Sequence, residues 1–138
     1  MSTNKAGTIL LNKKNKKICL IARKDGNGYE FPKGHLEGKE TLQECAIRET
    51  KEETMHNSHL ENDIPLGVIQ YENDSDGYVY LYIYIAIDDG ETTDVINEKD
   101  KEKCEWFDFD EVKDKLAFQN LIDLWDSYKD KIKEILEK

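Results

Sequence analysis

The sequence predicts an α/β domain in which a mixed β-sheet lies between helices. Three observations indicate this class. Short runs of β-branched, aliphatic and aromatic residues, bounded by Gly, Pro, Asn and Asp, have the composition of strands. Two longer stretches carry apolar residues at helical spacing. One of these stretches falls between groups of strands, so the order β-β-α-β-β-β-α is compatible with helices packed on the faces of one sheet.

The predicted strands begin with a hairpin. Ala6–Asn12 and Lys17–Arg23 are apolar runs on either side of a polar turn at 12–16. Residues 29–31 form a short extended piece that ends at Pro32, because proline favours extended geometry in the residue before it. Three further strands are predicted at Leu66–Tyr71, Tyr78–Ile87 and Glu105–Phe109.

The stretch 78–87 has the clearest strand pattern. Tyrosines alternate strictly with aliphatic residues, which places four tyrosines on one face of the strand. Both faces are large and hydrophobic, as in a central strand that is covered on both sides. We expect most of these tyrosines to pack beneath a helix. They are Tyr78, Tyr80, Tyr82 and Tyr84.

Capping signals predict where the helices begin. Thr41 and Glu44 form a capping box, and no proline or glycine interrupts the chain from there to Met55. A short helix is predicted to start after Asp108 or Asp110, either of which can cap it. A long amphipathic helix follows, and we expect its apolar stripe to pack on the sheet rather than to form a dimer face. The stripe consists of Phe118, Leu121, Ile122, Trp125, Tyr128, Ile132 and Ile135.

The first helix carries acidic residues where its apolar stripe should continue. At about 100° per residue, the face of Leu42 and Cys45 continues into Glu49, Glu52 and Glu53. Like charges at this spacing destabilise a helix by about 0.2–0.5 kcal/mol per pair. Mg²⁺ prefers oxygen ligands and would relieve this repulsion. The alternative is a solvated acidic surface, which a chain with 30 Asp and Glu residues also accommodates.

Size and charge exclude several classes of function. The 138 residues have a net charge of −10 and a pI of about 4.8, and we expect a single domain over 1–138. This charge argues against binding to duplex nucleic acid or to an anionic membrane. No apolar run has the roughly 18–20 residues of a membrane span. The unevenly spaced Cys19, Cys45 and Cys104 are expected to be reduced thiols of a soluble cytoplasmic protein, either a monomer or a homodimer.

Six residues at fixed spacing, G-x5-E-x7-R-E-x2-E-E, resemble a known motif. The motif is the Nudix hydrolase box, G-x5-E-x7-R-E-U-x-E-E-x-G-U with U aliphatic, and it would cover 34–56 here. The resemblance implies a Nudix-type α/β/α sandwich with a mixed β-sheet. It also implies a hydrolase that cleaves a phosphoanhydride in a nucleoside diphosphate linked to another moiety. The six residues are Gly34, Glu40, Arg48, Glu49, Glu52 and Glu53.

The chain departs from the box at three positions. Thr50 stands for the first aliphatic residue, Met55 for the glycine and His56 for the last aliphatic residue. None of these changes removes a carboxylate. Without the glycine we expect the helix to run on to Asn57, because asparagine tolerates the left-handed cap conformation.

The residues just before the box resemble one branch of the family. Phe31-Pro-Lys-Gly-His35 is similar to the Pro-Lys-Gly-His of enzymes that cleave diadenosine tetraphosphate asymmetrically, and Thr50 also fits that branch. This resemblance implies a small-molecule nucleotide substrate and the products ATP and AMP. Two alternatives stay open. One is a pyrophosphohydrolase for another nucleotide or for 5′-triphosphorylated RNA, and the other is a non-catalytic nucleotide-sensing module.

The resemblance implies a metal site for Mg²⁺, with Mn²⁺ as an alternative. Glu52 and Glu53 would hold the ion, helped by Glu49 and by the backbone carbonyl of Gly34. Either Glu49 or a carboxylate of a loop would act as the general base.

A further metal ligand is expected from the acidic loop 89–105. Asp100 has the offset before Trp106 that the family resemblance implies. Glu98 and Glu102 are alternatives.

Glu40 and Arg48 complete the box. Glu40 would orient Arg48 or hold a metal through water. On a helical wheel Arg48 points away from the carboxylates by roughly 80–140°, so we expect it to support catalysis through a structural ion pair rather than by touching phosphate.

The substrate-binding residues are expected around the start of the box. Lys33 would clamp a phosphate. His35 either shapes the loop with a hydrogen bond or contacts the substrate, and Tyr80 or Tyr82 would stack on an adenine ring, as aromatic residues of this region do in related enzymes. Arg23 either adds positive charge near the phosphates or is a plain surface residue.

Overall fold

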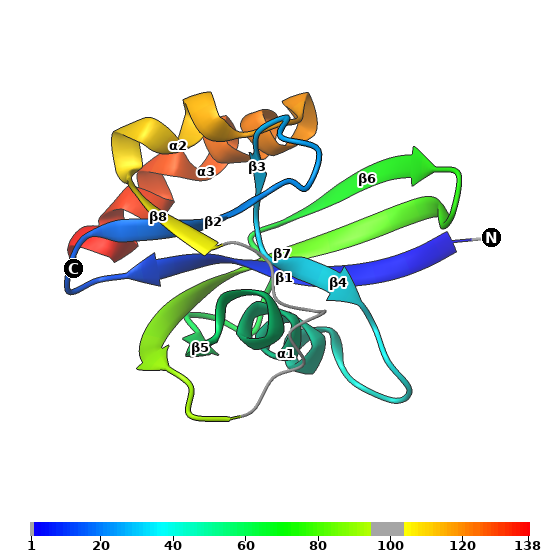
Figure 1. Cartoon of the computed structure of the whole chain (residues 1–138), viewed down its shortest axis with the longest axis horizontal. Coiled ribbons are helices and arrows are strands. Elements are labelled where there is room, and N and C mark those ends of the chain that lie inside the picture. Colours follow the sequence, from blue (N-terminus) through cyan, green and yellow to red (C-terminus); the bar gives the residue numbers. More distant parts are fainter. Residues whose placement is uncertain (1, 95–103) are drawn as a thin grey trace.

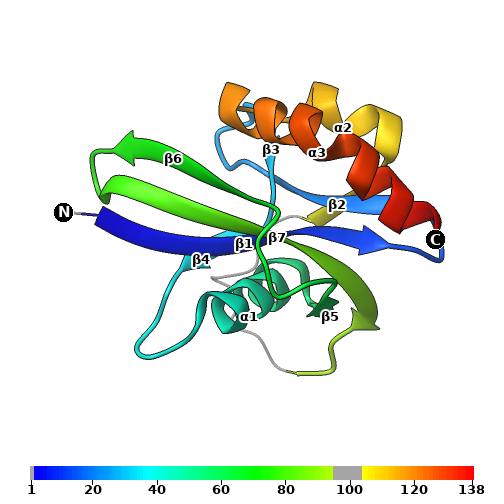
Figure 2. The ribbon, with the colours of Figure 1, turned by 180° about the vertical axis from the view of Figure 1, so that it is seen from behind.

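The computed structural model describes residues 2–94 and 104–138. The sheet lies between two helical layers: α2 (Phe109–Lys115) and α3 (Gln119–Glu137) cover one face, and α1 (Leu42–Thr54) covers the other (Figure 1). The view from behind shows the same layers (Figure 2). The expected α/β/α sandwich with a mixed sheet is therefore confirmed.

Two long strands form the centre of the sheet. β1 (Ser2–Asn12) and β7 (Gly77–Glu91) run parallel, with Ser2 opposite Tyr78. The other strand pairs among the described residues are antiparallel, which makes the sheet mixed. β2 (Lys17–Ala22) follows β1 as the expected hairpin.

Both central strands change their antiparallel partners along their length. Residues 5–7 of β1 pair with β4 (Lys33–His35), whereas residues 10–12 pair with β2. Likewise β7 pairs first with β6 (Gly67–Asn73) and then with β5 (His56–Leu60). The sheet therefore branches near its middle. The strands outside β2 are β3 (Tyr29–Glu30) and β8 (Cys104–Asp108).

The larger apolar core lies between the sheet and α3. Trp125 and Ile132 of α3 share a cluster of buried residues with Leu20 and Ile83 of the sheet. Val112 of α2 joins the same cluster. The helical spacing in the C-terminal part of the sequence thus reflects packing on the sheet for most of the predicted stripe. Two of its members are corrected: Phe118 is the N-cap residue and is 41% exposed, and Tyr128 is 36% exposed, so neither is part of the buried core.

The layer beneath α1 is smaller and partly polar. Cys45 of α1 is buried with Tyr84 of β7 in a cluster of four buried residues. Beside this cluster the hydroxyl of Thr50 lies 2.7 Å from that of Thr8 on β1, and both residues are fully buried. The paired hydroxyls satisfy each other, so a threonine replaces the aliphatic residue of the box without leaving an unpaired polar group.

The expectation that the first helix runs on to Asn57 is wrong. α1 ends at Thr54, and Met55 adopts the left-handed conformation with φ 64° while its N–H donates to the Lys51 carbonyl at 2.8 Å. Met55 thus takes the backbone role of the glycine in the box. His56 then starts β5, a strand missed in the sequence because its polar residues show no clear alternation.

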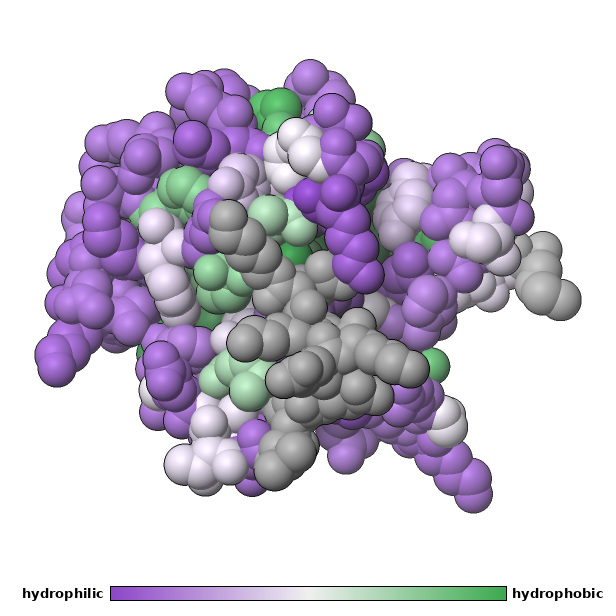
Figure 3. All heavy atoms as spheres, in the orientation of Figure 1, coloured by the Kyte–Doolittle hydropathy of each residue, from purple (hydrophilic) through white to green (hydrophobic). Residues whose placement is uncertain are grey.

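None of the helices in the described ranges is long and apolar enough to cross a membrane. The face shown in Figure 3 is mostly hydrophilic, with small apolar areas between charged side chains. This agrees with a chain in which 36% of the residues are charged.

Candidate functional site

The capping box predicted for α1 is present. The side chain of Thr41 accepts a hydrogen bond from the Glu44 N–H at 3.1 Å, and the Glu44 carboxylate accepts one from the Thr41 N–H at 2.9 Å. These reciprocal bonds fix where the helix begins. The helical positions of Glu49, Glu52 and Glu53 follow from this start.

The glutamates do not continue the buried stripe of α1, which corrects the helical-wheel expectation. After Cys45 and its neighbour Ala46, the fully covered positions are Thr50 and Thr54. The glutamates instead lie along one flank of this stripe. They are graded in exposure, since the Glu49 side chain is 14% exposed and that of Glu52 is 34% exposed.

Glu49 is held directly against Gly34 of β4. A Cβ added to Gly34 would lie 2.1 Å from the Glu49 carboxylate, so only glycine leaves room for it there. Burial raises the pKa of Glu49, and the Arg48 guanidinium only partly offsets that rise. Glu49 is thus a carboxylate whose burial is not fully compensated by positive charge from the protein.

Arg48 is the centre of an ion-pair network. Its guanidinium donates to both oxygens of Glu40 at 2.8 Å, to Glu49 at 2.8 Å and to Glu52 at 3.1 Å. It also donates to the backbone carbonyl of His35 at 2.9 Å. The predicted structural ion pair fits this geometry, but the expectation that Arg48 points away from the carboxylates is wrong, because its long side chain bends back over them.

Within the network, the pKa values of Glu40 and Arg48 shift in the directions that a strong ion pair requires, unlike that of Glu49, for which burial outweighs the ion pair. Hydrogen bonds from Arg48 lower the pKa of Glu40 to about 2, and those from Glu40 raise the pKa of Arg48. Glu40 also accepts from the Glu37 N–H at 3.0 Å. Both Glu40 oxygens are therefore engaged, which favours the orienting role over the metal-binding role.

The chemistry of the donor set fits a hard divalent cation. Glu49, Glu52 and Glu53 offer only oxygen atoms from successive turns of one helix, and the Gly34 carbonyl lies on the strand beside them. Two further observations favour a cation here: Gly34 lacks a side chain where the Glu49 carboxylate lies, and the burial of Glu49 is not fully compensated by positive charge. Within residues 2–94 and 104–138, no three His, Cys, Asp or Glu side chains already form a metal-holding group. The Arg48 guanidinium is hydrogen-bonded to Glu49 and Glu52 instead.

Lys33 connects this helix to two cavities. The larger cavity, of about 510 Å³, is lined by Lys33 together with Lys5, Tyr71 and Phe118. The smaller one, of about 340 Å³, is lined by Lys33 and Glu53. The Lys33 backbone N–H donates to the Glu53 carboxylate at 3.4 Å, so the lysine joins the acidic flank of α1 to both spaces.

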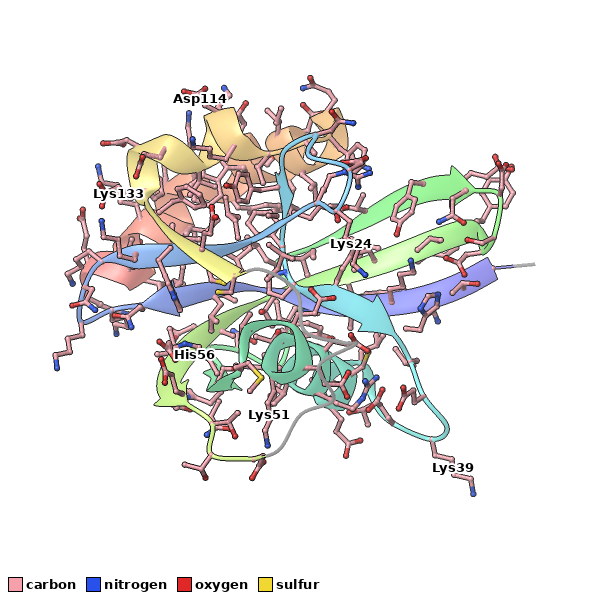
Figure 4. All side chains as sticks on the ribbon, in the orientation of Figure 1. Lys24, Lys39, Lys51, His56, Asp114 and Lys133 are labelled. Carbon is pink, nitrogen blue, oxygen red and sulfur yellow. The ribbon has the colours of Figure 1, made fainter. Side chains whose placement is uncertain are left out.

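Positive charge gathers on this side of the acidic flank. Arg23 lines both cavities, ion-paired with Glu30 at 3.2 Å, and Lys33 lies 3.8 Å from the same carboxylate. In contrast, Lys39 in the loop before α1 and Lys51 on α1 point away from the sheet (Figure 4). The chain is acidic overall, but the walls of these cavities carry several cations.

His35 lies in a position that fits the loop-shaping alternative. Its Nε2 lies 3.0 Å from Asp76 on the turn between β6 and β7, and its backbone carbonyl accepts from Arg48. Asp76 also pairs with Lys5 at 3.2 Å. No local sequence pattern points to Asp76, because its contact with His35 depends on a hairpin that folds back 41 residues away.

The structure does not bring Tyr80 or Tyr82 to the cavities. Tyr82 packs against the cluster beneath α1, and the alternation of β7 places Tyr80 on the same face. Leu81, which points the other way, lines the larger cavity. The predicted stacking role of these tyrosines therefore has no support here. The aromatic residues that line the larger cavity are Phe31, Tyr71 and Phe118.

The expected ligand from the loop is not located. Glu98, Asp100 and Glu102 lie outside the described residues.

His56 was assigned no role from the sequence. It is half-buried, with Nδ1 2.8 Å from Asp88, and its ring lies next to that of Trp106.

The NUDIX domain family matches residues 1–125 of the chain. A NUDIX-family hydrolase from Clostridium perfringens is 20% identical with a TM-score of 0.75, over 98% of each chain. The Ap4A hydrolase of C. elegans is 19% identical with a TM-score of 0.72, over 96% of this chain and 99% of that one. A NUDIX hydrolase from Nitrosomonas europaea is 18% identical with a TM-score of 0.73, over 95% and 90%. No curated protein sequence matches at a significant level.

Proposed function

The chain belongs to the Nudix family of hydrolases, and from this premise we propose that it cleaves diadenosine tetraphosphate asymmetrically to ATP and AMP. Membership makes the chain a hydrolase of phosphoanhydride bonds, in a family that acts on small nucleotides and generally uses divalent metal ions. The Pro32-Lys33-Gly34-His35 run and Thr50 support this substrate within the family. Three free cysteines support a cytoplasmic location.

The observation that carries the proposal is the pair of cavities that meet at Lys33. Both are lined by Arg23, Glu30, Phe31 and Lys33, so they adjoin one another. The larger has the size of a typical small-molecule site, and the smaller reaches Glu53. A nucleoside in the larger cavity would extend its phosphate chain past Lys33 toward the carboxylates of α1.

In this arrangement the cations position the substrate and Arg48 positions the carboxylates. Lys33 and Arg23 attract and position the polyanionic chain. Arg48 keeps Glu49 and Glu52 oriented, and it is itself fixed by Glu40. Arg48 thus acts on the substrate only through the carboxylates that it positions.

Glu52 and Glu53 would hold the divalent cation, with Glu49 and the Gly34 carbonyl beside them. When bound, the cation would supply charge neutralisation of the phosphate oxygens and a lowered pKa for bound water. A carboxylate of the same set would accept the proton of the attacking water.

Glu53→Gln tests this assignment. We expect hydrolysis to fall by more than about 100-fold, because even residues that only orient a metal ligand commonly cost about 10–100-fold when they are replaced. The matched control is Glu137→Gln, an exposed acid at the end of α3, which should leave the rate unchanged. The measurement is chromatographic identification of products from diadenosine tetraphosphate with Mg²⁺, alongside a panel of other nucleoside diphosphate derivatives and 5′-triphosphorylated RNA.

The product pattern decides between the candidates. Equal amounts of ATP and AMP support the proposal, whereas ADP alone would indicate symmetric cleavage and refute it. Better turnover of another nucleotide or of triphosphorylated RNA would transfer the assignment to that substrate. Nucleotide binding by the wild type without any hydrolysis would favour a sensor module.

A further inference from the structure

The wall of the larger cavity contains an amide whose oxygen has no hydrogen-bond partner. Among the described residues, two buried side-chain polar atoms lack a hydrogen bond, Ser58 Oγ on β5 and Asn120 Oδ1 in the first turn of α3. Asn120 lines the cavity of about 510 Å³, and Ser58 does not. The cavity wall thus offers an amide whose oxygen accepts no hydrogen bond from the described part of the chain.

A buried amide oxygen without a hydrogen bond is unfavourable unless a ligand supplies a donor to it. A donor or acceptor left without a partner loses the hydrogen bonds that water would give it. An amide presents one acceptor beside one donor group, and rotation about its last bond exchanges their positions. Gln119, next in the chain, is exposed and donates to Asp123 at 2.8 Å, so its amide is already used.

The neighbours of Asn120 fit a flat heteroaromatic ring. Tyr71 of β6 and Phe118, just before α3, line the same cavity, and aromatic faces of this kind stack on nucleobases. Each cation at the cavity wall already has a carboxylate neighbour: Lys5 pairs with Asp76 at 3.2 Å, Arg23 pairs with Asp25 at 2.7 Å and with Glu30 at 3.2 Å, and Lys33 lies 3.8 Å from Glu30 beside the smaller cavity. The buried polar atom without a partner in this cavity is the Oδ1 of a neutral amide, an acceptor that suits a base edge better than a phosphate.

We propose that Asn120 reads the base edge of the bound nucleotide and selects a base that carries an exocyclic amine next to a ring nitrogen, as adenine does. An amide makes two hydrogen bonds with that arrangement, one from the amine to its oxygen and one from its NH₂ to the ring nitrogen. A purine without the amine offers the ring nitrogen alone and leaves the Asn120 oxygen unpaired. This inference rests on the proposed function for the choice of adenine.

The test compares AMP with purine riboside 5′-monophosphate, which differs only by the missing amine. Binding is measured by titration calorimetry with the wild type, Asn120→Ala, Asn120→Asp and the matched control Gln119→Ala. We expect the wild type and Gln119→Ala to bind AMP about 10-fold more tightly or better, the range that a good paired contact to a base edge gives. In Asn120→Ala this preference should fall to about one.

Asn120→Asp sharpens the assignment, because a carboxylate keeps the acceptor for the amine but loses the donor to the ring nitrogen. It should retain part of the preference for AMP. Melting temperatures show whether each variant is folded, and alanine is well tolerated in a helix.

Three outcomes would overturn the proposal: no preference for AMP in the wild type, an undiminished preference in Asn120→Ala, or no binding of either nucleotide. The binding assay does not depend on turnover. A wild type that prefers AMP but hydrolyses no dinucleoside tetraphosphate would refute the proposed function and leave Asn120 as a base-reading residue. Normal hydrolysis with an unchanged preference in Asn120→Ala would refute only the role of Asn120.

Discussion

The two faces of the sheet differ in their packing: the α3 face is apolar, and the α1 face is partly polar. Beneath α3 lies a cluster of 18 buried apolar residues, among them Trp125 and Ile132. Beneath α1 the buried cluster has four members, and the contact continues through the hydroxyl pair of Thr8 and Thr50. The difference shows where stability and chemistry are placed: the α3 face supplies apolar burial, whereas the α1 face holds a charged network that is costly to bury.

The largest expected effect on stability lies on the α3 face. Trp125 is 2% exposed and packs on the ring of Phe109 at 5.0 Å between centroids. Trp125→Ala should lower the free energy of unfolding by about 3–5 kcal/mol, because it removes a large buried ring and leaves a cavity. The measurement is urea denaturation. Tyr128→Ala, on the same helix and 36% exposed, is the control and should cost much less. Equal losses in the two variants would break the contrast between the faces.

On the α1 face the expected effect is smaller and depends on pH. Glu40→Gln weakens the bond to Arg48 and should lower the free energy of unfolding at pH 7 by about 2 kcal/mol, the range for a hydrogen bond between charged groups. The folded state lowers the pKa of Glu40 from 4.5 to about 2. The stabilisation is therefore fully present above pH 4.5 and is lost as the pH falls toward 2.

Glu37→Gln is the matched control for this pair. Glu37 also approaches Arg48, at 3.6 Å, but its side chain is 69% exposed. Exposed ion pairs contribute little, so this variant should match the wild type across the pH range. A difference between Glu40→Gln and the wild type that stays constant from pH 7 to pH 2 would show that the ion pair is not its cause.

The smallest expected effect is an increase in the free energy of unfolding, caused by a change at Met55. Met55 holds a left-handed conformation at the end of α1, which costs a residue with a side chain roughly 1–2 kcal/mol. Met55→Gly should therefore raise the free energy of unfolding by about 1 kcal/mol. Asn57→Gly, inside β5, should lower it instead, because glycine is unfavourable within a strand. Destabilisation by Met55→Gly would indicate that contacts of the methionine side chain outweigh the backbone strain.

The sequence predicted the elements whose signals are local. The capping box of Thr41 and Glu44, the alternation of the strand 78–87 and most of the apolar stripe of α3 depend on neighbours within one element and appear as expected. The exposed Phe118 and Tyr128 at that stripe are the exceptions. β5 was missed because its polar residues form a strand only through pairing with β7. The helix end was misplaced because Met55, whose residue type does not favour the left-handed region, adopts it there, and its carbonyl accepts a hydrogen bond from the distant Thr92 N–H at 2.9 Å.

The site was predictable in its carboxylates but not in its surroundings. The spacing of the box located Glu49, Glu52 and Glu53, since they lie on one helix. The helical wheel predicted that Arg48 points away from these acids. Its long side chain bends back over them instead, because a side chain of this length is not confined to the direction of its Cα–Cβ bond. The cavity could not be foreseen, because Tyr71 and Asn120 come from distant segments that the fold brings together.

The most direct test of the account is the effect of Mg²⁺ on stability, measured as free energy of unfolding at constant ionic strength. If the acidic flank of α1 binds a divalent cation, the ion stabilises the folded state. The wild type and Glu137→Gln should gain about 2.7 kcal/mol at a Mg²⁺ concentration of 100 times Kd, and Glu53→Gln should lose most of this gain. No gain in the wild type, or an equal gain in Glu53→Gln, would contradict it.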